Sequence, residues 1–398
     1  MSCDAEPKKT LAVVTGTRAE YGLLRPVLKK LYARDELTVK LLVTGAHLSP
    51  AFGETVKEIE ADGFSIAVRV DILKFGTADT LATARTVSYA IGAFADLFST
   101  LRPDGCLVLG DRYEIFAAAA AAALLRVPVL HISGGDVTKG AADDWLRHSI
   151  TKMASLHFPS CEAYADRIIR MGEEPRRVYN VGGLGDENIR TMRLLSKQQL
   201  ADSIGVDLTN PYLLLTYHPE TLAKETPPQQ FKALLKALDG LPGYTLLFTK
   251  ANADAGGGQI NALIDAYVEK RGHAAAFESL GVLRYLSAMK YAAAVVGNSS
   301  SGMVETPSFG TPCVNIGSRQ EGRILCGNVI SCGAKEAEIA AALQKALGPD
   351  FQEEAKNAVS PYRGEDPSGD IARLSAEFLY GPLSHEIKSF YDGPKGAQ

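Results

Sequence analysis

Several features that would mark a specialised class of protein are scarce in this sequence of 398 residues. It has one tryptophan and six cysteines, and no cysteine lies in a CxxC pair or at a metal-ligand spacing. Scattered cysteines of this kind predict reduced thiols and no metal site. Long apolar runs are missing too. The longest, residues 115–125, has eleven residues, well short of the ~20 that span a bilayer.

An excess of charge of one sign is also absent. The chain carries 42 basic and 46 acidic residues, a net charge of -4, without a basic stripe. This balance argues against nucleic acid or an anionic membrane surface as a partner. The N-terminal segment MSCDAEPKK is polar and lacks the apolar region of a signal peptide. We therefore expect a cytoplasmic protein.

What is present is an ordinary globular composition, 46% hydrophobic and 22% charged, in a chain too long for one core. Short apolar runs alternate with helical patterns, which is typical of parallel sheets covered by helices on both faces. The sequence therefore predicts an α/β protein with two Rossmann-like, doubly wound domains. The expected strands are Leu11–Thr15, Thr38–Val43, Cys106–Leu109, Pro128–Ile132, Leu156–Pro159, Val178–Val181, Tyr212–Leu215, Thr245–Phe248, Ala293–Val296, Cys313–Ile316 and Asn328–Ile330.

Glycines at 182, 183 and 185 mark the expected domain boundary. We place the N-terminal domain at 1–185, the C-terminal domain at 186–365 and a tail at 366–398. A predicted helix, Lys197–Ile204, leads to the first strand of the second domain. Residues 361–380 have a helical pattern, and we expect this tail to cross back to the first domain. The seven alanines of Ala117–Ala123 predict a helix packed tightly on its sheet.

Two charged segments follow strands of the first domain. Residues 15–22, TGTRAEYG, open a helix directly after the first strand, where Arg18 can pair with phosphate oxygens. Residues 110–114, GDRYE, follow another strand. There Asp111 can act as an acid or base, and Arg112 can hold a substrate oxygen or phosphate. Ordinary strand-to-helix turns with solvated charges are the alternative interpretation of both segments.

A third segment of the first domain, 131–138, reads HISGGDVT and is followed by a helix that begins DDWLRH at residue 143. Asp143 and Arg147 lie one helical turn apart, as do Asp144 and His148. Paired carboxylates beside imidazole and arginine suit proton transfer, whereas helix capping and a surface ion pair are the structural alternative. The candidates from the last two segments are Asp111, Arg112, His131, Asp136, Asp143, Arg147 and His148.

The second domain has a different set of side chains at its strand ends. His218 ends one strand, and the segment GNSSSG at 297–302 joins another strand to a helix that carries Glu305. Serine hydroxyls and backbone amides at such a turn suit a diphosphate, and Glu305 can accept hydrogen bonds from ribose hydroxyls. Arg319 lies in GSRQEGR after a further strand. The candidate binding residues here are His218, Asn298, Ser299, Ser300, Glu305 and Arg319.

Seven segments in this order resemble the hydrolysing UDP-N-acetylglucosamine 2-epimerases of sialic and legionaminic acid biosynthesis. They are TGTRAEYG, GDRYE, HISGGDVT, DDWLRHSITKMASLHF, YHPET, GNSSSGMVE and NIGSRQEGR, spread over about Leu11 to Val329. The non-hydrolysing relatives typically carry GTRPE, a GDT strand end and a DSGG loop, so the segments favour the hydrolysing branch.

The resemblance implies two Rossmann-like domains of the GT-B type with an active-site cleft between them. It places the sugar on the N-terminal domain and the nucleotide diphosphate on the C-terminal domain. The implied reaction removes the proton at sugar carbon 2, eliminates UDP and hydrates the glycal to a free 2-epimeric sugar. It needs no cofactor and no metal. Relatives of this kind are homodimers or homotetramers, and the substrate is UDP-N-acetylglucosamine or a 4-acetamido-6-deoxy analogue such as UDP-diacetylbacillosamine.

One residue departs from the pattern. Some members have a glutamate after His-Ile that is proposed to transfer a proton, whereas this chain has Ser133. Serine is a poor base at neutral pH without an activating partner. Either Asp111, Asp136 or Asp143 then transfers the proton, or the substrate differs from UDP-N-acetylglucosamine. A non-hydrolysing epimerase, a GT-B glycosyltransferase and a non-catalytic nucleotide-sugar-binding protein are the alternatives.

Overall fold

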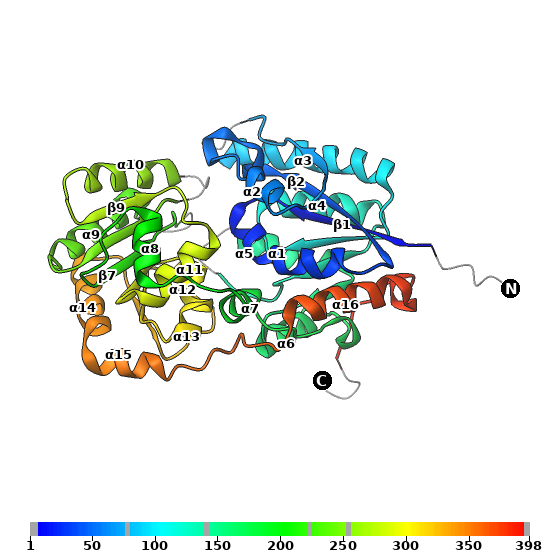
Figure 1. Cartoon of the computed structure of the whole chain (residues 1–398). Coiled ribbons are helices and arrows are strands. Elements are labelled where there is room, and N and C mark those ends of the chain that lie inside the picture. Colours follow the sequence, from blue (N-terminus) through cyan, green and yellow to red (C-terminus); the bar gives the residue numbers. More distant parts are fainter. Residues whose placement is uncertain (1–6, 76–79, 139–142, 221–224, 252–255, 394–398) are drawn as a thin grey trace. The chain divides into compact units, whose positions relative to one another are not determined.

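The computed structural model describes residues 7–75, 80–138, 143–220, 225–251 and 256–393 (Figure 1). The chain divides into two compact units. Unit 1 comprises the described residues of 1–136, 143–187 and 363–398, and unit 2 those of 137–142 and 188–362. The division lies after residues 187 and 362, whereas the sequence analysis placed domain boundaries after residues 185 and 365. Among the described residues, no helix is long and apolar enough to span a membrane.

The sheet of unit 1 is wholly parallel, with strand order β3-β2-β1-β4-β5-β6. Its two central strands are apolar and buried almost throughout, because helices cover both faces. The strands are β1 (Lys9–Thr15), β2 (Leu37–Thr44), β3 (Ile66–Val70), β4 (Gly105–Leu109), β5 (Val129–Ile132) and β6 (Leu156–Phe158).

Two apolar clusters lie on the opposite faces of this sheet. Helices α1 (Arg18–Tyr32), α2 (Val56–Ala61) and α16 (Pro367–Tyr380) pack on one face. Helices α3 (Thr80–Leu101), α4 (Tyr113–Leu124) and α5 (Asp143–Met153) pack on the other. The expected alanine helix is α4, and its small side chains are buried against the sheet and α3. The remaining helices are α6 (Glu162–Arg170) and α7 (Leu184–Thr191).

Helix α16 brings the C-terminal part of the chain back into unit 1. The Leu379 side chain packs so closely on Gly105 that a Cβ there would lie 2.9 Å from it. The Tyr380 hydroxyl donates to the Glu36 carbonyl at 2.9 Å. At the start of the helix, the buried carboxylate of Glu187 accepts a hydrogen bond from the Ser368 amide at 2.8 Å.

The sheet of unit 2 is also parallel, with order β12-β11-β10-β7-β8-β9. Helices α9, α10 and α14 cover one face, and α8 and α11 the other. The strands are β7 (Tyr212–Thr216), β8 (Thr245–Thr249), β9 (Ala274–Phe277), β10 (Ala294–Gly297), β11 (Cys313–Ile316) and β12 (Val329–Cys332). The helices are α8 (Lys197–Ile204), α9 (Pro227–Asp239), α10 (Gly257–Val268), α11 (Gly281–Tyr291), α12 (Ser300–Val304), α13 (Thr306–Phe309), α14 (Glu336–Leu347) and α15 (Pro349–Lys356).

The predicted α/β class and doubly wound topology are confirmed, but three strands differ from expectation. Residues 178–181 form no strand, because Val178 makes only one bridge, to His157 of β6. The edge strands β3 and β9 were not predicted. The first alternates exposed and partly buried residues, and the second begins with three alanines, so neither has a continuous β-branched pattern.

A buried ion cluster fastens the C-terminal segment to unit 1. The Glu173 carboxylate is fully buried and lies 2.5 Å from Lys152 Nζ, 2.9 Å from Lys388 Nζ and 3.2 Å from His157 Nε2. Burial alone would raise the pKa of Glu173, but hydrogen bonds from these three groups lower it to about 2. The Tyr391 amide donates to the Gly172 carbonyl beside this cluster at 2.9 Å.

Removing the charge at Glu173 leaves two lysines without their buried partner. We expect Glu173→Gln to destabilise unit 1 by about 3–5 kcal/mol, measured by urea denaturation. The exposed pair of Glu353 and Lys356, 2.9 Å apart, supplies the control. Its variant Glu353→Gln should cost less than about 1 kcal/mol. Equal midpoints for wild type and Glu173→Gln would contradict this account.

Candidate functional site

In each unit the strand order reverses at one position. The order of unit 1 reverses between β1 and β4, and that of unit 2 between β7 and β10. Open parallel sheets bind ligands at the carboxyl ends of the strands beside such a reversal. In unit 1 these ends carry residues 16–18 and 110–112, and in unit 2 they carry 217–218 and 298–301. Both reversals are therefore flanked by segments that the sequence singled out.

The turn after β1 is capped by a carboxylate of the chain itself. Thr17 is the N-cap of α1, and Glu20 Oε2 accepts hydrogen bonds from the amides of Gly16 at 2.8 Å and Thr17 at 3.2 Å. These two amides are thus occupied, although such a turn suggests phosphate binding by the backbone. The partly exposed Arg18 side chain is the group of this turn that can meet an anion.

A second carboxylate, that of Glu114, is buried under the same turn. Its Oε1 accepts a hydrogen bond from Arg112 Nε at 2.9 Å, and its side chain is 0% exposed. A Cβ on Gly16 would lie 2.4 Å from Glu114 Cγ, so glycine is required there by this contact. Sequence reasoning quoted both TGTRAEYG and GDRYE but passed over Glu20 and Glu114, because acidic residues beside arginine resemble solvated surface charge.

Asp111 and the residues of α5 form a chain of charged groups. Arg147 is almost fully buried and is paired with Asp111 and, at 3.3 Å, with Asp144 Oδ1. Asp144 Oδ2 lies 3.6 Å from His148 Nε2. The structure thus joins the predicted residues Asp111, Arg147 and His148 through Asp144. Asp143 begins the same helix and is partly exposed; residues 139–142 before it lie outside the described part of the chain.

Burial and neighbouring charges fix the protonation of two groups in this chain. Burial lowers the pKa of His148, although the Asp144 charge opposes the shift. Its imidazole is therefore neutral at physiological pH. Burial disfavours the charged form of Arg147 as well, but Asp111 and Asp136 outweigh it and raise its pKa. A neutral imidazole and a permanent cation then both lie beside the Asp144 carboxylate, an arrangement suited to proton transfer beside a negative charge.

In this structure His131 is buried too completely to contact a substrate directly. It is completely buried in β5, and its Nε2 lies 2.8 Å from the Gly110 carbonyl, a contact that requires the proton on Nε2. Burial lowers its pKa to about 3. The neutral ring thereby holds the turn that carries Asp111. A direct catalytic role for His131 stays a prediction.

The segment after β5 has strained backbone at Ser133, whose φ is +63°. This left-handed conformation is uncommon outside glycine and tends to occur at functional sites. Gly135 is also left-handed, and a Cβ there would lie 2.5 Å from the Tyr164 carbonyl of α6. Packing against α6 is therefore a structural reason for that glycine. Asp136 is buried close by.

In unit 2 the two central loops are joined by one side-chain amide. Asn298 Oδ1 accepts from the His218 amide at 2.7 Å, and its Nδ2 donates to the His218 carbonyl at 2.9 Å. Ser299 is the N-cap of α12 and accepts from the Ser301 amide at 3.4 Å. Asn298 thus fixes His218 beside the serine turn, which brings the predicted residues His218, Asn298, Ser299 and Ser300 together.

Glu305 lies at the end of α12 and accepts a hydrogen bond from the Ser301 hydroxyl. Burial raises its pKa to about 7, and the Ser301 hydrogen bond opposes the shift. Tyr285 Oη lies 3.4 Å from Thr216 Oγ1 at the end of β7, and burial followed by the Glu305 charge raises the pKa of this phenol to about 12. Ser301 lies in the quoted segment GNSSSG but was not named as a candidate on its own, and Tyr285 comes from α11, outside the quoted segments.

The loop after β11 is also capped by an internal carboxylate. Glu220 Oε1 accepts from the amides of Ser318 at 2.8 Å and Arg319 at 3.1 Å. A Cβ on Gly317 would lie 2.1 Å from the same oxygen. Arg319 Nη1 donates to the Asn298 carbonyl at 3.1 Å. The predicted Arg319 therefore lies against the serine turn, held by Glu220, which sequence reasoning did not single out.

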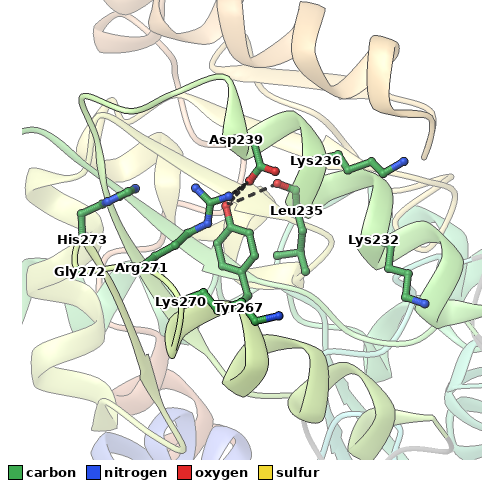
Figure 2. A pocket seen from close by; sticks show the side chains of 9 residues that line it. All are labelled: Lys232, Leu235, Lys236, Asp239, Tyr267, Lys270, Arg271, Gly272 and His273. Carbon is green, nitrogen blue, oxygen red and sulfur yellow. Dashed lines mark hydrogen bonds and ion pairs between the residues drawn. The ribbon is translucent and has the colours of Figure 1, made fainter.

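Two described cavities of unit 2 differ in where they lie relative to this reversal point. One of about 550 Å³ is lined by Lys232, Lys270 and His273, among others, at the amino end of β9 (Figure 2). Figure 2 shows its Arg271 and Tyr267 turned toward Asp239. This end of a parallel sheet does not bind ligands in open α/β folds. Another, of about 700 Å³, lies beside the loop of 317–323.

Among the described residues, no group of three or more His, Cys, Asp or Glu side chains is placed to hold a metal ion. The five described cysteines are free thiols, four of them buried. The candidate site is therefore built from carboxylates, arginines, imidazoles and hydroxyls.

Two doubly wound parallel sheets, with charged and hydroxyl side chains at both reversal points, define a nucleotide-sugar enzyme of the GT-B type. Residues 29–375 match the family of UDP-N-acetylglucosamine 2-epimerases. The chain belongs to this family. The predicted membership and the predicted class, a nucleotide-sugar 2-epimerase, are confirmed.

Similar proteins match most of the chain. It is 44% identical to the hydrolyzing GDP/UDP-N,N'-diacetylbacillosamine 2-epimerase of Campylobacter jejuni, over 81% of this chain and 84% of the relative. It is 34% identical to the hydrolyzing UDP-N,N'-diacetylbacillosamine 2-epimerase of Legionella pneumophila, over 85% and 89%. The polysialic acid biosynthesis protein P7 of Escherichia coli is 36% identical, over 97% and 98%.

Solved structures support the fold. The UDP-GlcNAc 2-epimerase of Neisseria meningitidis, solved with UDP-GlcNAc bound, superimposes with a TM-score of 0.77 at 19% identity, over 93% of this chain and 99% of that one. The corresponding enzyme of Methanocaldococcus jannaschii, in complex with UDP-GlcNAc and UDP, gives a TM-score of 0.77 at 16% identity, over 92% and 99%.

The buried carboxyl of Glu20 makes a prediction about pH. Burial, followed by the charge of Glu114, raises its pKa from 4.5 to about 8, against the opposing effects of Arg112 and the two amides. The folded state then holds a proton that the unfolded chain has lost, so stability falls as pH rises from about 4.5 to about 8. Glu20→Gln keeps an acceptor for the amides and cannot ionise.

We therefore expect the melting temperature of wild type to decline more steeply than that of Glu20→Gln between about pH 5 and about pH 8. The exposed Glu60, paired with Arg69, gives the control variant Glu60→Gln, whose curve should follow wild type. Parallel curves for Glu20→Gln and wild type would show that Glu20 does not carry this proton.

Proposed function

We propose that this chain is a hydrolysing nucleotide-sugar 2-epimerase whose preferred substrate is UDP-N,N'-diacetylbacillosamine. The observation that carries the proposal is its identity of 44% and 34%, over more than four fifths of both chains, to two proteins named for that hydrolysing reaction. UDP-N-acetylglucosamine is the second substrate to be tested. The name of the Escherichia coli relative, a polysialic acid biosynthesis protein, supports a place in sialic acid biosynthesis, and the resemblance of the sequence segments supports sialic or legionaminic acid biosynthesis.

The proposed reaction has two steps. A base removes the proton at carbon 2 of the sugar, the bond between carbon 1 and the diphosphate oxygen breaks, and UDP leaves with those electrons. Water then adds across the resulting double bond, with hydroxyl at carbon 1 and a proton at carbon 2 from the opposite face. The products are UDP and a free 2-epimeric sugar. Neither step requires a metal or a redox cofactor.

We assign the proton transfers to unit 1. Asp111 and Asp143 are the proposed acid and base, and the neutral His148 is a further candidate because it lies beside Asp144. Arg147 stabilises negative charge next to Asp111. The deep burial of His131 supports a positioning role through Gly110. Asp136, Arg18 and Arg112 complete the proposed contacts of this unit.

We assign the nucleotide to unit 2. Ser299, Ser300 and Arg319 are proposed to hold the diphosphate, together with His218, which Asn298 fixes beside the serine turn. Glu305 is proposed to accept hydrogen bonds from the ribose, since its carboxyl lies at the end of α12 and is bound to Ser301. We further propose a cytoplasmic homodimer or homotetramer, which sedimentation velocity would test.

The reaction is tested by incubating the protein with each UDP-sugar in heavy water and, separately, in water labelled with heavy oxygen. We expect free UDP without any acceptor, one deuterium at carbon 2 and one labelled oxygen at carbon 1 of the free sugar, by mass spectrometry. A UDP-linked epimer without free UDP would identify a non-hydrolysing epimerase. UDP release that depends on an acceptor would identify a glycosyltransferase, and binding without turnover a binding protein.

The proposed acid and base are tested by Asp111→Asn and Asp143→Asn. Each should lower kcat about a hundredfold or more, because proton transfer contributes to the transition state. Affinity for UDP should change little, since we assign the nucleotide to unit 2. Asp350→Asn, at an exposed position of α15, is the matched control. Near-normal kcat in both test variants would refute the assignment.

A further inference from the structure

One charged side chain at the reversal point of unit 1 has no place in the reaction described above. Glu114 lies in the first turn of α4 and is 0% exposed, so it cannot itself meet a substrate. It is paired with Arg112, a proposed substrate contact, whose side chain is 14% exposed. The pair thus connects a partly exposed side chain, Arg112, to a fully buried one, Glu114.

The hydrogen bond between them restricts how Arg112 can bind. Glu114 Oε1 accepts from Arg112 Nε at 2.9 Å. A guanidinium meets a carboxylate or phosphate in two-pronged fashion either side-on, through Nε and one Nη, or end-on, through both Nη atoms. Because Nε is bound to Glu114, the side-on approach is blocked. An oxyanion would then be met end-on.

The carboxyl group of Glu114 occupies a slot built by two glycines. A Cβ on Gly16 would lie 2.4 Å from Glu114 Cγ and 3.0 Å from Oε1, and a Cβ on Gly45 would lie 3.4 Å from Oε1. Gly45 also has a φ of +59°. These residues follow β1 and β2, so the loops of two strands leave room for a side chain from the helix after β4. A surface salt bridge requires no space of this kind, so the two glycines indicate that the position of the Glu114 side chain is specifically accommodated.

We propose that Glu114 is a positioning residue that holds the Arg112 guanidinium end-on toward an oxyanion of the substrate. The role rests on the proposed function, because Arg112 is assigned to the substrate there. Glu114 acts through Arg112 and touches no reacting atom. Gly16 is required for this arrangement, since any larger residue would displace the Glu114 side chain.

The first test is independent of catalysis. The Nε–H proton of Arg112 should give a slowly exchanging arginine resonance in a nitrogen-correlated spectrum, assigned by its loss in Arg112→Lys. Glu114→Gln keeps the volume but weakens the charged hydrogen bond, so the resonance should shift and exchange at least about tenfold faster. Glu60→Gln should leave it unchanged. An unaltered resonance in Glu114→Gln would overturn the proposal.

The second test is kinetic. Glu114→Gln should lower kcat/KM about tenfold or more while the melting temperature stays within a few degrees of wild type, and Glu60→Gln should match wild type in both. If wild type turns over and Glu114→Gln has the same kcat/KM, the positioning role alone is overturned. Absence of turnover in wild type with every UDP-sugar would instead remove the proposed function, and the resonance test would still decide the geometry.

A double-mutant cycle separates positioning from a general loss of packing. Gly16→Ala should lower kcat/KM because its Cβ would push Glu114 away from Arg112. In the Glu114→Ala background the same change meets no side chain, so it should cost less than about twofold further. The melting temperature of the double variant should also equal or exceed that of Gly16→Ala alone. Additive losses in kcat/KM would show that Gly16 acts separately from Glu114, against the proposal.

Discussion

The reversal of strand order in a parallel sheet is the constraint on which both halves of this protein depend. Neighbouring loops run to opposite faces of the sheet at that point alone, and they leave the carboxyl ends of two central strands uncovered. In unit 1 those ends are β1 and β4, and in unit 2 they are β7 and β10. The buried apolar strands therefore do more than form two cores, because their order decides which charged residues meet.

In both units the backbone amides of one such loop donate hydrogen bonds to a glutamate carboxyl of the chain itself. Glu20 binds the amides of Gly16 and Thr17, and Glu220 binds those of Ser318 and Arg319. A carboxyl group of the protein itself thus occupies donors that a phosphate could otherwise take. These internal hydrogen bonds fix the loops before any ligand binds. The side chains of the loops, and not these backbone amides, are then the groups that can bind a ligand. Preorganised donors of this kind lose little freedom on binding.

How much the sequence could predict depends on whether a signal is local. Strands such as Leu11–Thr15 were predictable because continuous apolar runs mark burial on both faces. The edge strand β9 was missed because three alanines carry no such mark. Residues Asp111 and His218 could be singled out as candidates because they follow strands. Glu114 could not be found, because its burial arises from the packing of α4 over Gly16 and Gly45, which are distant in sequence.

The same distinction bears on Ser133, where some family members have a glutamate. Its left-handed backbone, with φ of +63°, is held by a hydrogen bond from its amide to the Phe158 carbonyl at 3.0 Å. The turn therefore keeps an unusual conformation although its side chain is a poor base. Unit 1 also has the carboxylates of Asp111 and of Asp144 on α5, both of which are paired with Arg147. A serine at this position is thus compatible with proton transfer by other carboxylates of unit 1, and it bears on the identity of the substrate more than on the type of reaction.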